Sequence, residues 1–375
     1  MKEKNKIIVI ILLLITLIVL LYALDSPYLH MIEKIKDGNT ENLLDVQNEI
    51  ERGNVSITVT GDVMFGRNTP GALSLDESPY RFVSNVTSNT DILLVNTENP
   101  FTTTSGAVKP DVPLKASPDY IPLINGTNGT VVSANANNHV FDYGVEGMRD
   151  SIKNLDENGI LHIGAGENKQ EATNPITLER NGHNITIFNY MDSKNFQEYS
   201  QEVMPIAGDD KPGYSAWDDV ESPKQIMEAK NNSDIVLVYI HYGNEYSRQP
   251  NDDQISISHK AIDAGADAVV GTHTHVTQGI EVYNDRPIFY SLGNFIFDQS
   301  NPATHTAYFV SFNVTGENVS AYVYPVYISG YLPQFMSPDD GKSLLNNLNP
   351  QCSQMEVTDD GIGVIKYNLT RNTTK

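Results

Sequence analysis

The sequence predicts an α/β fold in which buried strands alternate with helices. Residues 233–240 are almost continuously apolar, as in a strand that is covered on both faces of its sheet. Residues 144–155 carry apolar side chains at helical spacing, and residues 252–264 predict a second helix between two strands. Because a strand, a polar loop and a helix follow one another repeatedly, we expect the strands to end at one common edge.

The amino-terminal segment predicts a membrane anchor. Residues 7–24 contain no charged side chain, and a helix of that length would rise about 27 Å, close to the hydrocarbon thickness of a bilayer. A cleavable signal peptide is the alternative, but its apolar core is shorter and the segment offers only a poor cleavage site. Three lysines lie within residues 1–6, which are therefore expected in the cytoplasm. We expect a single-pass protein of the cell membrane, with a polar linker over residues 25–52 and an extracellular globular part.

The composition argues against several classes of partner and of metal site. A formal net charge of −22 argues against nucleic acid or anionic lipid as a broad-surface partner. Cys352 is the only cysteine, which excludes an intrachain disulfide and a cysteine-based zinc site. Ten Asn-x-Ser/Thr sequons fit an exported glycoprotein, although a chain rich in Asn, Ser and Thr also forms them by chance. The sequons begin at Asn54, Asn85, Asn125, Asn128, Asn184, Asn231, Asn313, Asn318, Asn368 and Asn372.

The first two predicted strands end in oxygen-bearing side chains. Residues 55–60 alternate between apolar and polar and lead into a Gly-Asp pair that ends at Asp62. The apolar run 91–95 is followed by Asn96 and Glu98. Taken singly, a Gly-Asp pair is more typical of a turn, and Asn96 with Glu98 is typical of a polar loop.

The next two predicted strands end beside histidines. Residues 129–134 lead into Asn138 and His139, directly before the first helix. Residues 233–240 end at His241. A lone histidine after a buried strand is more often a hydrogen-bonded structural residue, and asparagines suit a turn. Each of these features alone is therefore weak evidence for a site.

A pair of histidines, His273 and His275, follows a fifth predicted strand over residues 267–270. In an extended segment, residues two apart project to the same side, so both imidazoles are expected to converge on one point. Imidazole is the commonest protein ligand of metal ions. Four of the nine histidines lie at strand ends, and five successive strands each deliver a polar side chain there. Together these strand ends predict one shared metal site.

The motifs at these strand ends resemble those of the poly-gamma-glutamate capsule synthesis (CapA) family, whose fold is similar to that of the calcineurin-like metallophosphatases. The resemblance covers residues 55–298 and rests on six motifs in the expected order. They are TGDVMFGR (60–67), NTENPFT (96–102), ANNHVFDYG (136–144), HYGNEY (241–246), GTHTH (271–275) and RPIFYSLGNF (286–295). The resemblance implies a four-layer α/β/β/α sandwich over residues 53–335, with a C-terminal extension over residues 336–375.

The resemblance also implies roles for individual side chains. The metal ligands would be Asp62, Glu98, Asn138, His241, His273 and His275. Glu98 would take the bridging position between two ions. His139 would contact the substrate or protonate its leaving group, and Arg67 would hold an anionic oxygen.

Two departures from the phosphatase pattern bear on the number of ions. Met64 stands where phosphatases have a histidine, and Asn96 with Glu98 replaces their second Gly-Asp motif. Both variations are typical of the CapA-like group, and they leave open whether one or two divalent ions bind. The mixed oxygen and nitrogen ligands suit Mn, Zn or Fe.

Two strands and a short extension are expected after the last motif. Residues 307–314 and 319–326 alternate like paired strands around a turn at residues 316–318. Residues 337–375 predict one helix, one strand and a polar tail. No chemistry is evident in either region.

The predicted anchor places the protein at the outer face of the membrane, and the resemblance implies a role in the synthesis of a capsule or other surface polymer of the poly-gamma-glutamate type. We expect a metal-dependent hydrolase or transferase whose partners are the polymer or its precursor and polymer synthase subunits. The alternative is a noncatalytic scaffold that binds or guides a polymer through the envelope. The net charge of −22 would repel an acidic polymer except at a cleft lined by cations.

Overall fold

The computed structural model describes residues 52–196, 199–348, 352 and 354–370. The chain divides into two units, Met1–Asn54 and Val55–Lys375, and every helix and strand described belongs to the second. The predicted anchor over residues 7–24 and all but the last residue of the predicted linker lie outside the described residues. In the part that is described, no helix is long and apolar enough to cross a membrane. The anchor stays a prediction.

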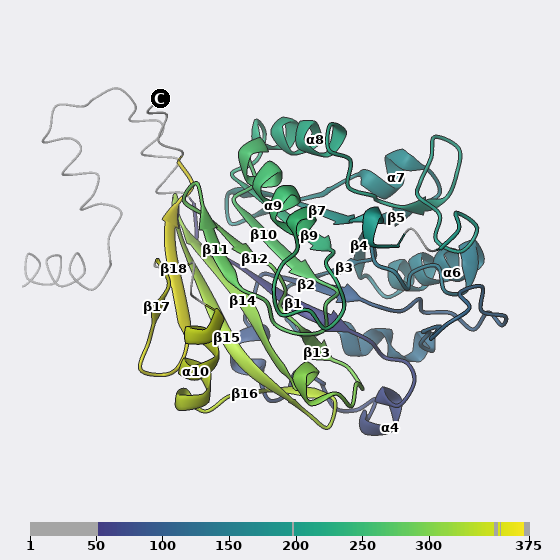
Figure 1. Cartoon of the computed structure of the whole chain (residues 1–375), viewed down its shortest axis with the longest axis horizontal. Coiled ribbons are helices and arrows are strands. Elements are labelled where there is room, and N and C mark those ends of the chain that lie inside the picture. Colours follow the sequence, from purple (N-terminus) through teal and green to yellow (C-terminus); the bar gives the residue numbers. More distant parts are fainter. Residues whose placement is uncertain (1–51, 197–198, 349–351, 353, 371–375) are drawn as a thin grey trace, which may run out of the picture. The chain divides into compact units, whose positions relative to one another are not determined.

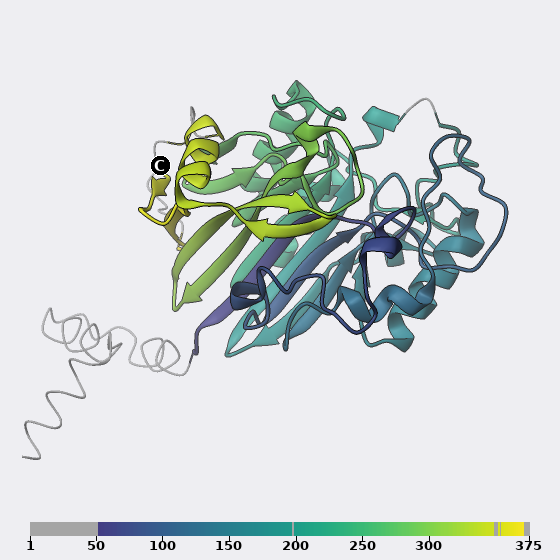
Figure 2. The ribbon, with the colours of Figure 1, turned by 90° about the horizontal axis from the view of Figure 1, so that it is seen from below.

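The second unit is a mixed α/β fold built on two large sheets. The ten-stranded sheet has the order β17 (Glu356–Val357), β18 (Gly363–Asn368), β15 (Asn318–Ser329), β14 (Thr306–Thr315), β1 (Val55–Val63), β2 (Ile92–Thr97), β3 (Thr130–Ala134) and β4 (Leu161–Ile163), with β13 (Asn294–Ile296) beside β1 and β16 (Leu332–Phe335) beside β15. The six-stranded sheet has the order β11 (Ile280–Tyr283), β12 (Arg286–Phe289), β10 (Ala268–Thr272), β9 (Ile235–His241), β7 (His183–Met191) and β6 (Ile176–Arg180). A small sheet pairs β5 (Ala165–Gly166) with β8 (Gly213–Tyr214). Figure 2 shows the purple strand β1 between yellow-green and blue strands of the larger sheet.

Helices connect the strands and cover the sheets. The α-helices are α4 (Thr69–Ala72), α5 (Ser84–Thr87), α6 (Gly144–Glu157), α7 (Lys169–Thr173), α8 (Glu221–Lys230), α9 (Asp252–Ala264) and α10 (Pro338–Leu348), and the 3-10 helices are η1 (Pro118–Ile124), η2 (Ser193–Phe196) and η3 (Pro302–His305). Helix α9 begins at a capping box in which Asn251 and Gln254 bond each other's backbone, and it ends at Gly265, whose φ of 125° suits glycine. In Figure 1, α8 and α9 lie together beside β9 and β10.

The hydrophobic core lies in three layers. Between the two sheets, Val59 and Leu94 of the larger sheet share one buried cluster with Leu237 of the smaller sheet. On the outer face of the smaller sheet, Ile257 of α9 joins residues of β9 and β10 in a second cluster. On the outer face of the larger sheet, Leu155 of α6 joins residues of β2 and β3. The layers therefore run helix, sheet, sheet, helix, which is the order that the family resemblance implies.

The strands that carry the candidate residues belong to two sheets, so the expectation of one common edge is wrong. Strands β1, β2 and β3 run parallel in the larger sheet, whereas β9 and β10 run parallel in the smaller one. The reason is β7, a strand absent from the sequence prediction, which pairs with β9 and starts the second sheet. The expected hairpin of β14 and β15 is confirmed, and β18 of the C-terminal extension pairs with β15.

A buried aspartate holds the far end of the smaller sheet together. Asp267 precedes β10 and is fully buried, and its Oδ2 accepts hydrogen bonds from Lys230 Nζ at 2.7 Å and from the Val236 N–H at 2.9 Å. Its Oδ1 lies 3.4 Å from Arg286 Nε. Arg286 also donates to the carbonyl oxygen of Leu369 at 3.0 Å, just after β18. The Asp267 carboxylate thus links α8 to the smaller sheet, and Arg286 connects it to the end of the larger sheet.

Replacing Asp267 with alanine should therefore destabilise the fold. We expect a loss of about 3 kcal/mol in the free energy of unfolding, because the change leaves the buried guanidinium of Arg286 without its carboxylate. Urea denaturation of the purified protein measures this. The control is Asp209→Ala at an exposed aspartate, which should change the value by less than about 0.5 kcal/mol. Equal stability of the two variants would contradict a structural role for Asp267.

Candidate metal centre

Asp62 reaches the candidate site because β1 and β13 approach closely at Gly61. A Cβ atom on Gly61 would lie 1.9 Å from the carbonyl oxygen of Gly293, so only glycine fits there. The backbone N–H of Asp62 donates to that carbonyl at 3.1 Å. The buried carboxylate of Asp62 accepts a hydrogen bond from Asn96 Nδ2 at 2.8 Å. The Gly-Asp pair is thus part of a strand that orients a carboxylate, and Asn96 supports that carboxylate.

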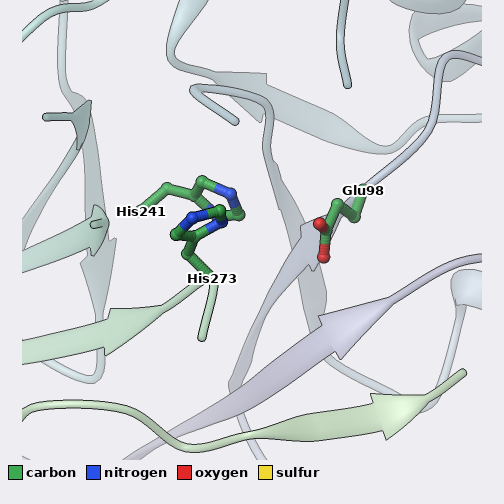
Figure 3. Close-up of side chains that lie close together, drawn as sticks. All are labelled: Glu98, His241 and His273. Carbon is green, nitrogen blue, oxygen red and sulfur yellow. The ribbon is translucent and has the colours of Figure 1, made fainter. Parts of the chain in front are cut away.

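A first group of metal-ligand atoms comes from β9, from the segment after β10 and from the segment after β2. Each of the three residues Glu98, His241 and His273 offers one ligand atom, and these three atoms lie within 4.8 Å of one another. All three residues are buried. Figure 3 shows the two imidazole rings side by side, with the Glu98 carboxylate opposite them. The Oδ1 atom of Asn138 lies 2.9 Å from His241 Nε2. Two ligand atoms that bind one ion at about 2.1 Å, with a right angle between the bonds, are about 3 Å apart, close to the distance between these two atoms.

A second group shares Glu98 with the first. Ligand atoms of Asp62, Glu98 and His275 lie within 4.8 Å of one another, and these residues are also buried. The Nδ1 atom of His275 lies 3.4 Å from Asp62 Oδ2, and its Nε2 lies 3.7 Å from Glu98 Oε1. The structure therefore brings the six predicted metal ligands together, with Glu98 between two positions.

The two histidines of the pair fall into different groups, so the expectation that they meet at one point is wrong. Their ring centroids are 6.3 Å apart. The backbone is the physical reason: φ is 96° at His273 and 59° at His275, in the left-handed region, and the segment forms bends after β10 ends at Thr272. Non-glycine residues adopt such angles where the surrounding structure holds them, often at functional sites.

Several buried polar atoms of the site have no hydrogen-bond partner in the described part of the chain, which is typical of atoms that bind a metal. Both carboxylate oxygens of Glu98 and Nδ1 of His273 are buried without a partner among the described residues. Buried polar atoms in native proteins are rarely left unpaired, since each costs free energy. A divalent cation would satisfy these three atoms, and the mixed oxygen and nitrogen set fits Mn, Zn or Fe. The residues present therefore fit the expected metal.

Burial and close charges shift the pKa values of the site. Burial and the neighbouring Asp62 carboxylate raise the pKa of Glu98 well above its usual value. Burial, together with the nearby histidines, holds the pKa values of His241 and His273 well below the usual value. Burial would also lower the pKa of His275, but the carboxylates of Glu98 and Asp62 outweigh it and raise that pKa to about 9. Lowered pKa values favour the neutral imidazole, which is the form that binds a metal.

His139 lies beside the two groups and belongs to neither. Its Nε2 lies 3.8 Å from Glu98 Oε1, and its Nδ1 lies 2.6 Å from Asp142 Oδ2. The same carboxylate oxygen accepts a hydrogen bond from the Leu114 N–H at 2.6 Å. Burial raises the pKa of Asp142 to about 8 and lowers that of His139 well below its usual value. Asp142 therefore fixes the ring of His139, a role that sequence reasoning missed although Asp142 lies in the ANNHVFDYG motif.

Arg67 and Met64 lie at the same end of β1. Arg67 forms an ion pair with Asp298, and its guanidinium stands 5.5 Å from the ring centre of Phe297. The charge of Arg67 is thus already compensated by a buried carboxylate.

Met64 is buried with Leu114 and Phe297, and its sulfur accepts the backbone N–H of Gly66. The position for which the resemblance implies a histidine in phosphatases is therefore filled by apolar packing.

The site opens into a cavity of about 320 Å³. His139, His273, His275 and Arg67 lie in its wall. Lys109 is among the lining residues that sequence reasoning missed, because it lies in an irregular segment with no periodicity. Sequence reasoning also missed Asn294, whose Oδ1 lies 2.9 Å from His275 Nδ1. The signal for Asn294 was its place in the RPIFYSLGNF motif.

Known proteins are similar in sequence to this chain over most of its length. Residues 56–299 match a family model described as "Bacterial capsule synthesis protein PGA_cap". The PGA biosynthesis protein CapA of Bacillus subtilis (strain 168) is 31% identical over 317 residues, covering 82% of this chain and 81% of the relative. The capsule biosynthesis protein CapA of Bacillus anthracis is 32% identical over 274 residues, 70% of this chain and 65% of the relative. A solved structure of a hypothetical protein from Thermus thermophilus is 15% identical over 74% of this chain and 96% of that chain, with a TM-score of 0.39. From the family model and the two CapA relatives, the chain belongs to the bacterial capsule synthesis protein family PGA_cap.

Proposed function

We propose that this protein is a metal-dependent hydrolase or transferase that acts in the synthesis of a capsule polymer. The observation that carries the proposal is the shared carboxylate of Glu98, whose two buried oxygens lack partners among the described residues and stand between two sets of ligand atoms. A bridging carboxylate between two cations is typical of sites that clamp an oxygen-rich substrate from both sides.

The side chains have distinct tasks in this proposal. Glu98, His241 and His273 with Asn138 would hold one ion, and Asp62 and His275 would hold a second ion on the other side of Glu98. When bound, such ions polarise the group to be cleaved and activate water for attack.

The protein itself would manage the proton. Because Asp142 occupies Nδ1 of His139, Nε2 is the ring nitrogen left to give a proton to the leaving group or take one from the nucleophile. His139 also lines the cavity, within reach of a substrate there.

The names of the relatives support a proposal for the polymer, and the predicted anchor supports a proposal for the location. The two CapA relatives are named for PGA or capsule biosynthesis. We extend this to a substrate that is a poly-gamma-glutamate-like surface polymer or its precursor, with polymer synthase subunits as partners. The predicted anchor over residues 7–24 would hold the domain at the outer face of the cell membrane.

Metal analysis and activity assays on one sample of the full chain test the proposal. Protein purified in detergent without chelator should carry one or two equivalents of Mn, Zn or Fe by mass spectrometry. It should hydrolyse a phosphoester or a γ-glutamyl bond. Dialysis against a chelator should abolish the activity, and adding back the metal should restore it. Metal-free protein without either activity would contradict the proposal and favour the noncatalytic scaffold.

A further inference from the structure

Lys109 is a buried cation in the wall of the cavity. It lies in the irregular segment between β2 and η1, and its side chain is only 4% exposed. It lines the cavity together with Asn138 and His139. Charged lysines are rarely buried to this extent unless their ammonium group has partners.

The partners of Lys109 within the described residues leave part of its hydrogen-bonding capacity unused. Its Nζ donates to the backbone oxygen of Asn138 at 3.1 Å. Lys109 also forms an ion pair with Asp142, but the Oδ1 atom of that carboxylate is 3.9 Å from Nζ, which is beyond hydrogen-bonding distance. The ring centre of Tyr199 is 5.2 Å away. An ammonium group has three donors, so Lys109 can still donate to an acceptor in the cavity.

Of the arginine and lysine side chains that line the cavity, Lys109 is the one without a hydrogen bond to a carboxylate among the described residues. Arg67 already pairs with Asp298. Asp111 and Glu245 add negative charge to the same wall, in a chain with a net charge of −22. An anion would therefore be repelled from most of this surface and attracted beside Lys109, where the low exposure strengthens a charge-assisted hydrogen bond.

We propose that Lys109 binds an anionic oxygen group of the substrate, a carboxylate or a phosphate, beside His139, and thereby selects anionic substrates. This inference rests on the proposed function, because it places the anion on the substrate of the same site. The cavity thus recognises two features of one ligand: the group to be cleaved near Glu98 and a neighbouring negative charge at Lys109.

Anion binding to the full chain tests the assignment. We would titrate the purified protein by calorimetry with inorganic phosphate and, separately, with glutarate, and measure metal content on the same samples. Lys109→Met should raise the Kd for at least one anion by about tenfold or more, with unchanged metal content. A larger effect on glutarate would indicate a carboxylate ligand, and a larger effect on phosphate would indicate a phosphate.

The chain offers a matched control lysine. Lys115 also donates to a backbone oxygen, that of Thr104 at 2.8 Å, and its ammonium lies 4.6 Å from the ring centre of Tyr143. It is not among the residues that line the cavity. Lys115→Met should therefore leave both Kd values unchanged.

A second variant predicts the opposite sign, which damage to the fold would not produce. The Asp111 carboxylate accepts the Tyr199 hydroxyl at 2.9 Å, and Asp111→Asn keeps an acceptor oxygen there while removing the negative charge. This variant should bind the anion more tightly, and an unchanged or raised Kd would contradict an anion site in this cavity even if Lys109→Met does not fold.

The outcomes separate this inference from the proposed function. Unchanged Kd values in Lys109→Met, or a wild-type protein that binds neither anion, would overturn the role of Lys109. Loss of metal along with the anion in Lys109→Met would also overturn it, because Lys109 would then only position Asn138. Wild-type protein without metal would contradict the proposed function, and the two anion titrations would still decide on Lys109.

Discussion

Replacing Glu98 with glutamine should remove metal from both positions and lower activity by about a thousandfold or more. The reason is that Glu98 alone belongs to both groups of ligand atoms. A neutral amide has one oxygen for metal binding and no negative charge to hold two cations close together. Loss of this side chain therefore affects both groups, whereas loss of Asp62 or His273 affects one.

Metal content and thermal stability measure this effect independently of turnover. Addition of metal should raise the Tm of the wild-type protein by mass action, and it should not raise that of Glu98→Gln. The control is Glu281→Gln. Glu281 lies on β11, hydrogen-bonds Tyr290 and His259, and is absent from both ligand groups. If Glu98→Gln kept one full equivalent of metal, Glu98 would not be a bridging ligand.

The His139→Ala variant should lose about 10²-fold to 10⁴-fold in kcat while it keeps its metal. The structure motivates both halves of this result. His139 is absent from the two ligand groups, so metal binding does not depend on it. Its Nε2 lies 3.8 Å from Glu98 Oε1 and its Nδ1 is held by Asp142, which suits a group that moves a proton at the reacting centre.

His259 provides the matched control for His139. Like His139, it pairs with a carboxylate through a ring nitrogen, here Nε2 at 3.1 Å from Glu281, but it does not line the cavity. His259→Ala should retain full activity and full metal content. Loss of metal in His139→Ala would make His139 a ligand, and unchanged kcat would remove it from the proton transfer.

The sequence predicted strands, helices and ligand types where the evidence is local. β9 is buried on both faces, so its apolar run and the terminal His241 could be found from composition alone. The distribution of strands over two sheets could not be found in this way. It depends on the pairing of β7 with β9, whose paired residues are about 50 positions apart in the sequence. It also depends on β6, which pairs with β7 at the edge of the smaller sheet.

The parts of the site that sequence reasoning missed depend on tertiary contacts. The left-handed backbone at His273 and His275 separates the two rings, and no residue type at these positions indicates it. Lys109 comes from a segment without secondary structure, and only packing brings it beside Asn138. Asp142 was visible as part of a motif, but its role follows from its 2.6 Å contact with His139.

The close approach of Gly61 to Gly293 also sets the order in which the centre can form. During synthesis Asp62 leaves the ribosome long before Gly293. The hydrogen bond from the Asp62 N–H to the Gly293 carbonyl, which orients Asp62, needs both residues. A nascent chain that ends just before Gly293 would therefore hold all six predicted ligands without the backbone carbonyl that positions Asp62. Metal uptake can then follow only near-complete synthesis of the domain, and any truncation before residue 293 should abolish it. Bound metal would therefore indicate that the domain has folded completely.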